Sequence, residues 1–333
     1  MSLHIASSDM SRQLRRLVND MVIPFTDNLL VGPCPHGVTD FIDARVRYWR
    51  DVPGSGRTWR AMYGRLVEAL GSHSEITLWS SGSLQFSALR WMICSLTRER
   101  SSTRIIARMV DRGNKPRDDL LGCCEERLGL SELRALLRGG AQPISKTQRR
   151  ADERRWRSFT SSKPVRFSVR CRTEDPVLRR MRHYHLQHFP RMIRKQLHVS
   201  LLDELLLKCV SRSWSHLGEI LMRRSDEGVA LRTRLYCTGD AFMVRRLHEW
   251  LGHDGQKPVI DVERQPSNAL PSGVRYRMTR RGLDLLERGI RDISDGPACS
   301  IGGGAAYDPA QPIVAVMDGG EWTLAELRGT SRG

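Results

Sequence analysis

The first third of the chain alternates short apolar runs with stretches of helical periodicity. Four apolar runs have the length of a strand, at residues 3–6, 22–25, 76–79 and 104–110. Between them, apolar residues recur every three or four positions, which is typical of amphipathic helices. Strands that alternate with helices in this way predict a parallel sheet, flanked by helices and joined by right-handed crossovers.

Polar residues directly follow three of these predicted strands. Because ligands collect at the carboxyl ends of parallel strands, we expect a small polar-ligand site where these residues converge. Arg45, in the helical stretch after the second strand, is suited to neutralise an anionic ligand. The alternative is that the serines and aspartates only cap helices, a role that suits Ser8 or Asp9. The candidate ligand-binding residues are Ser7, Ser8, Asp9, Asp27, Asn28, Arg45, Trp79 and Ser81.

The last third of the chain has a different pattern. Its predicted elements are helices at residues 201–210, 214–222 and from 239 onwards, extended runs at 258–264 and 274–278, and a short helix capped by Thr279. Three helices, a β-hairpin and a short helix are the outline of a winged helix. Such modules often place the third helix in a groove of nucleic acid, although many bind only proteins.

The whole chain is therefore predicted to be an α/β protein in three parts. The first is a domain with a parallel sheet, flanking helices and the ligand site. A basic helical connector follows it, and a winged-helix-like α+β domain ends the chain. The predicted boundaries are residues 1–140, 141–198 and 199–333.

The positive charge of the chain is concentrated in the connector. The 333 residues include 54 lysines and arginines against 37 aspartates and glutamates, a formal net charge of +17. Residues 146–196 contain 16 of the basic residues and four of the acidic ones. Five aromatic residues are interleaved with them: Trp156, Phe159, Phe167, Tyr184 and Phe189.

Basic residues that alternate with aromatics suit a polyanion with stackable bases. The alternative is a helical connector whose aromatics pack inward and whose arginines are solvated. Arg245 and Arg246 are expected on the exposed side of the third helix of the last domain. The candidate nucleic-acid-binding residues are Arg149, Arg150, Arg154, Arg155, Arg245, Arg246, Arg275 and Arg277.

Other features of the sequence predict a cytoplasmic protein without a metal site. None of the eight cysteines forms a Cys-x-x-Cys pair, which favours reduced, buried thiols. The chain shows no signal peptide and no run long enough to span a membrane. His183, His185 and His188 have no further ligand type nearby, so we expect no metal, and no cofactor is indicated. The glycines at 302–304 predict a flexible turn.

Short motifs at both ends of the chain form a set. In the first part they are Leu3-His4-Ile5 with Ser8-Asp9, Asp27-x-Leu29-x-x-Gly32-Pro33, Arg45-x-x-Tyr48-Trp49 and Leu78-Trp79. In the last part they are Gly239-Asp240-x-Phe242, Arg246-Leu247, Tyr276-Arg277-Met278-Thr279-x-x-Gly282 and Ile301-Gly302-Gly303. The set resembles the bacterial family named domain of unknown function eighteen-thirty-five, with its usual C-terminal companion domain. That family has no assigned activity, so the resemblance implies architecture more than function.

The chain also departs from that family. Many members carry acidic and histidine residues directly after the tryptophan of the third strand. Here the same stretch reads Ser80-Ser81-Gly82-Ser83-Leu84-Gln85, which lowers the expectation of catalysis.

Three functional hypotheses agree with these patterns. The first is a cytoplasmic protein that associates with nucleic acid and carries a small polar-ligand site at its strand ends. The second is an enzyme that uses Asp27 and Arg45 on an anionic substrate, phosphorylated or nucleotide-like. The third is an adaptor that docks protein partners or a second copy of itself, without a membrane.

Overall fold

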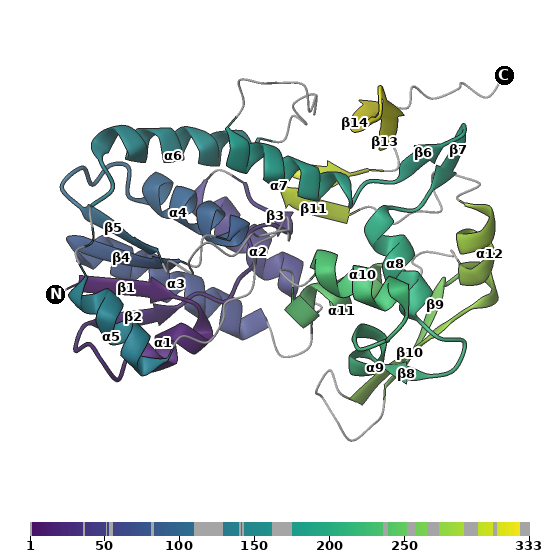
Figure 1. Cartoon of the computed structure of the whole chain (residues 1–333), viewed down its shortest axis with the longest axis horizontal. Helices are drawn as coiled ribbons and strands as arrows, with labels where there is room; N and C mark the ends of the chain where they lie inside the picture. Colours follow the sequence, from purple (N-terminus) through teal and green to yellow (C-terminus); the bar gives the residue numbers. More distant parts are fainter. Residues whose placement is uncertain are drawn as a thin grey trace.

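A computed structural model of the chain has the mixed α/β architecture drawn in Figure 1. It describes residues 2–35, 37–50, 52, 56–80, 83–109, 129–139, 141, 143–161, 175–235, 239–251, 257–264, 273–289, 299–308 and 312–326. The elements of the first third lie on the left of Figure 1, and most elements of the last third lie on the right.

Four parallel strands form the sheet of the first third, in the order β2-β1-β4-β5. They are β1 (Ser2–Ala6), β2 (Met21–Pro24), β4 (Glu75–Ser80) and β5 (Arg104–Met109). Ile5 in β1 pairs with Ile23 on one side and with Leu78 on the other. The predicted parallel sheet is therefore confirmed, and each of the four apolar runs contains an observed strand or overlaps one.

Helices cover both faces of this sheet. Successive side chains of a strand point to opposite faces, so apolar residues of one strand enter two different hydrophobic clusters. Ile5 belongs to the main hydrophobic core together with Leu66 and Leu89, whereas Ala6 packs with Met10 and Leu133 on the other face. The helices of this part are α1 (Ser8–Leu14), α2 (Val38–Trp49), α3 (Gly56–Ser72), α4 (Leu84–Leu96) and α5 (Leu130–Arg138). The predicted flanking helices are thus confirmed.

Two helices continue the chain along one edge of the molecule, α6 (Lys146–Phe159) and α7 (Pro176–Leu186). The Ser145 hydroxyl caps α6 by accepting a hydrogen bond from the Gln148 amide at 3.1 Å. Asp175 caps α7, where Pro176 occupies the first helical position. One face of α6 is buried, partly against α4, and the opposite face is exposed.

The last third contains a cluster of helices and a small antiparallel sheet in the order β8-β10-β9. Thr279 caps α12, because its hydroxyl accepts a hydrogen bond from the Gly282 amide at 3.1 Å. The elements are α8 (Leu201–Cys209), β8 (Ser215–His216), α9 (Leu217–Leu221), α10 (Asp226–Leu235), α11 (Gly239–Glu249), β9 (Ile260–Arg264), β10 (Val274–Met278) and α12 (Arg280–Arg288).

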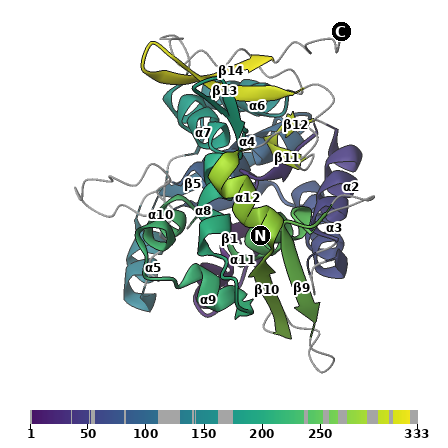
Figure 2. The same cartoon turned by 90° about the vertical axis from the view of Figure 1, so that its right-hand side faces the viewer.

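The C-terminal strands leave this part and pair with earlier ones. β11 (Cys299–Gly303) forms a hairpin with β12 (Ala305–Tyr307) and pairs in parallel with β3 (Gly32–Pro33). The hairpin of β13 (Ile313–Asp318) and β14 (Glu321–Glu326) extends a second one, β6 (Arg191–Ile193) and β7 (Gln196–His198). Figure 2 shows the β13–β14 and β9–β10 hairpins at opposite ends of the molecule. The pairing thus crosses the boundary predicted at residue 199.

The three consecutive glycines near the C-terminus lie where backbones approach closely. A Cβ atom on Gly302 would overlap the Leu30 carbonyl oxygen and the His185 ring. Gly303 has a φ of +59°, and a Cβ there would overlap the carbonyl of Phe159. The prediction of a turn is therefore correct for Gly304, which joins β11 to β12, and wrong for Gly302 and Gly303, which belong to β11. All three fill a passage too narrow for side chains.

Candidate functional site

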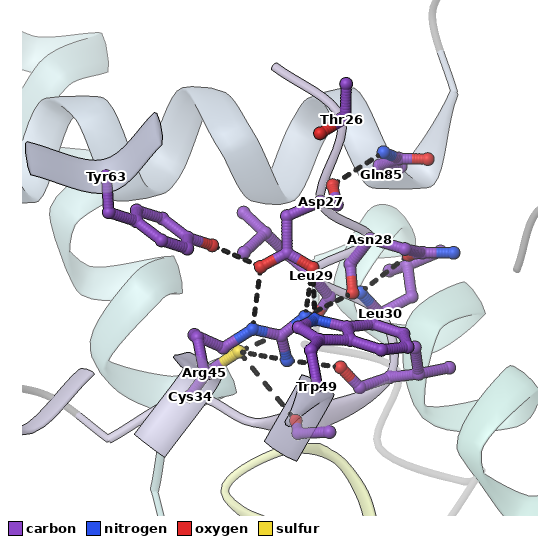
Figure 3. Close-up of polar contacts among 12 residues, drawn as sticks. Thr26, Asp27, Asn28, Leu29, Leu30, Cys34, Arg45, Trp49, Tyr63 and Gln85 are labelled. Atoms are coloured by element: carbon purple, nitrogen blue, oxygen red, sulfur yellow. Dashed lines mark hydrogen bonds and ion pairs between the residues drawn. The ribbon is translucent and has the colours of Figure 1, made fainter. Parts of the chain in front are cut away.

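Asp27 lies at the centre of an enclosed hydrogen-bond cluster, which is drawn in Figure 3. Arg45 of α2 donates from Nε to Asp27 Oδ2 at 2.8 Å, and its Nη2 forms an ion pair with Oδ1. The Trp49 indole donates to Oδ1 at 2.9 Å, and the Tyr63 hydroxyl of α3 donates to Oδ2. The side chains of Asp27 and Arg45 are both 0% exposed.

The remaining donors of Arg45 hold the loop between β2 and β3. Nη2 also donates to the Asn28 carbonyl at 2.9 Å, and Nη1 donates to a further carbonyl of the loop. The Asn28 side chain accepts a hydrogen bond from the Leu30 amide at 3.0 Å. Gln85 of α4 donates to the Asp27 carbonyl at 2.8 Å. The cluster therefore joins α2, α3 and α4 to the segment that follows β2.

Burial and charge hold Arg45, Tyr63 and Cys34 in their protonated forms. Burial alone lowers the pKa of Arg45, but the neighbouring Asp27 carboxylate outweighs it and raises that pKa above its ordinary value. Burial first, and then the charge of Asp27, raise the pKa of Tyr63 well above its ordinary value. Burial raises the pKa of the Cys34 thiol to about 11. Neither the phenol nor the thiol therefore supplies a nucleophile at neutral pH.

The predicted pair of Asp27 and Arg45 is thus present but closed to a ligand. A carboxylate that acts as acid, base or anion partner must reach the reacting group or the ligand. Both side-chain oxygens of Asp27 are already engaged by donors of the protein at full burial. We interpret the cluster as a structural ion pair that positions the β2–β3 loop, and the expectation of a substrate at Asp27 loses its support.

Four other ligand-binding candidates lie on the β1–α1 segment and on β4, outside the hydrogen bonds that join Asp27 to α2 and α3. Ser7 is half-buried after β1, and Ser8 and Asp9 are exposed at the start of α1. Trp79 packs on the sheet face covered by α1 and α5, where its indole donates to His4 Nδ1 at 3.0 Å. The predicted convergence therefore does not hold for Trp79. Ser81 lies outside the described residues.

A second buried aspartate repeats the arrangement in the last third. Asp203 of α8 accepts two hydrogen bonds of 2.6 Å from Arg246 and one of 3.2 Å from the Trp250 indole. Ser200 donates its hydroxyl to the same carboxylate at 2.7 Å. In both clusters the arginine precedes the tryptophan by four residues, so the two side chains share one helical face. This repeated spacing is the sequence signal that could have identified both arginines as partners of buried aspartates.

The predicted exposure of Arg245 and Arg246 on α11 is wrong. Arg246 is 5% exposed and binds Asp203. Arg245 lies over the Tyr48 ring of α2, 4.1 Å from its centroid, and donates to the Tyr48 carbonyl. Residues 241–249 of α11 are all buried or half-buried. The helix packs between the first and last thirds of the molecule and is closed to a groove of nucleic acid.

The two hairpin arginines are engaged by acidic residues on the neighbouring strand. Arg275 pairs with Glu263, and Arg277 Nε lies 2.9 Å from Asp261 Oδ2. The Arg277 guanidinium also lies over the Trp214 ring, 4.6 Å from its centroid. Both pairs are partly exposed and weak, but they reduce the net charge that the hairpin offers to a polyanion.

The four candidate arginines of α6 fall into two groups. Arg149 is buried and donates to oxygens at the C-terminal end of α4, among them the Thr97 hydroxyl at 2.9 Å. Arg155 forms ion pairs with two aspartates, at 2.7 and 2.6 Å. Arg150 and Arg154 are exposed. Of these four candidates, Arg150 and Arg154 are therefore the ones best placed to meet a partner.

The aromatic residues interleaved with these arginines face inward. Trp156, Phe159, Tyr184 and Phe189 are all buried in hydrophobic clusters, and Phe167 lies outside the described residues. The expectation that they stack on bases is therefore wrong for these four. For them the alternative of inward packing is confirmed.

Two of the three clustered histidines are buried. His185 Nε2 lies 2.8 Å from the Leu30 carbonyl, and the His188 ring packs against Tyr184 and Phe242. Burial lowers the pKa of His185 to about 4. Burial first, and then electrostatic interaction with His185 and Arg246, lower the pKa of His188 well below its ordinary value. The described part of the chain holds no group of three side chains that could bind a metal.

These two histidines are expected to make the protein less stable in mild acid. In the unfolded chain both protonate near their ordinary pKa of 6.5, whereas in the folded protein both resist protonation. Their contribution to the free energy of unfolding is therefore complete above pH 6.5. It declines as the pH falls towards 4, by about 1.4 kcal/mol per pH unit for each histidine. Urea unfolding at pH 7.5, 6, 5 and 4.5, within about this window, measures the slope.

A His188→Gln variant is expected to show a shallower pH dependence than the parent protein. His183→Gln, at an exposed position of α7, the helix that precedes His188, serves as its matched control and should leave the slope unchanged. His4, whose pKa burial also lowers, adds to the slope in all three proteins. Equal slopes for the parent and His188→Gln would contradict the assignment.

The comparisons add no family to these observations. No family model matches the chain, and no curated protein matches it significantly. Among the described residues, no helix combines the length and the apolar character needed to cross a bilayer.

Proposed function

We propose that this protein binds nucleic acid through the exposed face of α6. Five side chains of α6 are exposed, and four of them are cations. These four occupy positions i, i+4, i+8 and i+11, so they form a line about 16 Å long on one side of the helix. We name them the α6 ridge: Lys146, Arg150, Arg154 and Arg157.

The opposite face of α6 holds the ridge in a fixed orientation. Arg90 of α4 lies 2.9 Å from the buried Asp152 carboxylate, and Trp156 is enclosed in the main core. The acidic side chains of α6 itself are Asp152, which is buried, and Glu153, which is half-buried and lies 4.0 Å from Arg149. A fixed line of cations without an exposed acid attracts a polyanion. This single observation carries the proposal.

The same proposal includes a winged-helix-like fold for the last domain and a cytoplasmic location for the protein. The order helix, strand, helices and hairpin, with β10 central in its sheet, supports a winged-helix-like unit over residues 199–289. In this proposal α11 forms the contact with α2 and does not read bases. Cys34, Cys94 and Cys209 are buried, which supports a reducing cytoplasm.

A polar-ligand site at the sheet remains a second candidate function because of the strand order. β1 pairs with β2 on one side and with β4 on the other. The connection from β1 to β2 therefore runs towards one edge of the sheet, and the connection from β2 to β4 runs back towards the other edge, which makes the gap between β1 and β4 a topological switch point. Ligands of open α/β sheets bind at such a switch point, beyond the carboxyl ends of the strands. Ser7 and Ser8 follow β1 there, and they replace Asp27 and Arg45 as the candidate contacts.

Neutralising the α6 ridge is expected to weaken nucleic-acid binding strongly. The variant carries Lys146→Gln, Arg150→Gln, Arg154→Gln and Arg157→Gln, all at exposed positions that leave the core intact. Each lost phosphate contact should reduce the slope of log K against log salt by about 0.9, so four contacts reduce it by about 3 to 4. Fluorescence anisotropy with labelled duplex and single-stranded oligonucleotides across a salt series measures both quantities.

The matched control removes the same charge from another face. It carries Arg12→Gln, Arg16→Gln, Arg134→Gln and Arg138→Gln, exposed positions on or beside α1 and α5. This control should retain most of the affinity and a slope close to that of the parent. Equal losses in the two variants would mean that net charge alone drives binding, and a parent protein without salt-dependent binding would refute the proposed function.

A further inference from the structure

The α6 ridge has a shape and a chemistry that distinguish among nucleic acids. The inference that follows rests on the proposed function and concerns the form of nucleic acid that the ridge selects. Four observations bear on it: the surroundings of the ridge, the composition of the ridge, the geometry of α6, and the enclosure of α11.

Among the described residues, the surroundings of the ridge offer no exposed Phe, Tyr or Trp on which unpaired bases could stack. Proteins that hold single strands stack successive bases on exposed aromatic rings, which contribute about 1–3 kcal/mol per base. In α6 and α7 the aromatic side chains Trp156, Phe159 and Tyr184 are buried. Across the described residues, the exposed large hydrophobic side chains are methionines and valines, with no aromatic among them. A single strand would therefore gain only phosphate contacts here.

The ridge itself carries charge but little capacity to read sequence. Besides its four cations, the exposed face of α6 has only Thr147. Arginine and lysine bind phosphates in every sequence context, and the one base that they bind in a bidentate way is guanine, whereas bidentate recognition of adenine needs an asparagine or glutamine. The half-buried Gln148 is held by Asp152 at 3.0 Å. The contacts available to the ridge are therefore those of the sugar-phosphate backbone and, among the bases, those of guanine.

The geometry of α6 suits a groove of B-form DNA. Figure 1 places this 14-residue helix along an edge of the molecule. Its exposed side chains lie on the side opposite Asp152, which contacts Arg90 of α4. The major groove of B-form DNA is about 12 Å wide and admits an α-helix, while the major groove of A-form RNA is too narrow for side chains to read. A helix with cations along its exposed face can thus enter the DNA groove and approach the phosphates on both sides of it.

Because α11 is enclosed, it is not available to bind in a DNA groove, as the third helix of a winged-helix unit often does. Arg246 is committed to Asp203, and Arg245 is held against Tyr48. Sequence readout through α11 would require the first and last thirds to separate and would leave the Asp203 carboxylate without its ion pair. The ridge needs no such change.

We propose that the α6 ridge binds the phosphate backbone of double-stranded DNA without preference for base sequence. The expected binding is salt-dependent, with about four phosphates neutralised and a slope near −3.6. Affinity should vary little between unrelated duplexes of equal G·C content, because the ridge binds phosphates in any sequence and guanine is the one base that its arginines and lysine recognise.

The test compares defined probes with the full chain at one salt concentration and then across a salt series. The probes are three unrelated two-turn DNA duplexes of equal G·C content, oligo-dT of the same length, a duplex RNA, and vesicles of phosphatidylserine. We expect the three DNA duplexes to bind within about threefold of one another, and oligo-dT and duplex RNA to bind about tenfold more weakly at equal salt. The variant of the α6 ridge should lose this preference, while the control variant of α1 and α5 should keep it.

The outcomes separate this inference from the function on which it rests. Oligo-dT or duplex RNA bound as tightly as duplex DNA would overturn the inference while leaving nucleic-acid binding in place. One duplex bound at least tenfold tighter than the others would overturn it as well, because it would show base readout. Binding to the vesicles alone, or to no probe, would overturn both the inference and the proposed function.

Discussion

An Asp27→Asn variant is expected to lose about 3–5 kcal/mol of unfolding free energy, since it breaks a fully buried ion pair. The neighbours of the carboxylate explain why an amide of the same shape fails there. Arg45, Trp49 and Tyr63 all donate hydrogen bonds to Asp27. An asparagine amide group would face these donors with a donor of its own, and the Arg45 charge would remain buried without a counter-ion.

The loss would show as a lower midpoint in urea unfolding followed by tryptophan fluorescence. Asp9→Asn is the matched control, because Asp9 is exposed and lies 3.8 Å from Arg12 in an ordinary surface pair. Its effect should stay within about 0.5 kcal/mol. If Asp27→Asn cost less than about 1 kcal/mol, the cluster would not be a structural ion pair, and a role for Asp27 in ligand binding would regain support.

A Gly302→Ala variant is expected to destabilise the protein by about 3 kcal/mol, near the upper end of the range for an overpacked core. The added methyl group would overlap the Leu30 carbonyl and the His185 ring, which are hydrogen-bonded to each other at 2.8 Å. Neither can move freely, since Leu30 belongs to the loop held by Arg45 and His185 is buried in α7. The strand would have to leave β3, where Gly302 pairs with Gly32.

Gly64→Ala provides a control with the opposite sign. Gly64 is exposed within α3, and a Cβ there meets no atom within 4 Å. Alanine should stabilise that helix by about 0.5–1 kcal/mol, because it is the better helix former. The two variants can be compared directly by their urea midpoints. Equal midpoints for the two alanine variants would show that the passage around β11 is wide enough for a side chain.

The two aspartate clusters show how far spacing alone could have identified a buried pair. Arg45 with Trp49 and Arg246 with Trp250 have the same separation of four residues, and in each case the pair encloses an aspartate. The sequence correctly suggested that Asp27 and Arg45 belong together. Their complete enclosure depends on Tyr63, which is 36 residues from Asp27 in the chain. No periodicity in the sequence reports a contact of that range.

The secondary structure of the first third was determined by the sequence itself. Parallel strands buried on both faces require short, nearly continuous apolar runs, and the intervening helices require apolar residues on one side. These are local properties that can be read from the order of residue types. The four-stranded parallel sheet and its flanking helices follow the predicted pattern.

Only the tertiary structure decided which charges are free to act. Arg149 and Arg150 are neighbours in the chain, yet one is buried against the end of α4 and the other is exposed, because adjacent residues of a helix point about 100° apart. Which side of α6 turns inward depends on its packing against α4, and the enclosure of α11 depends on its contact with α2. Burial and ion pairing arise between segments that are distant in sequence. The composition therefore determined how much positive charge the chain carries, and tertiary packing determined that the α6 ridge is exposed.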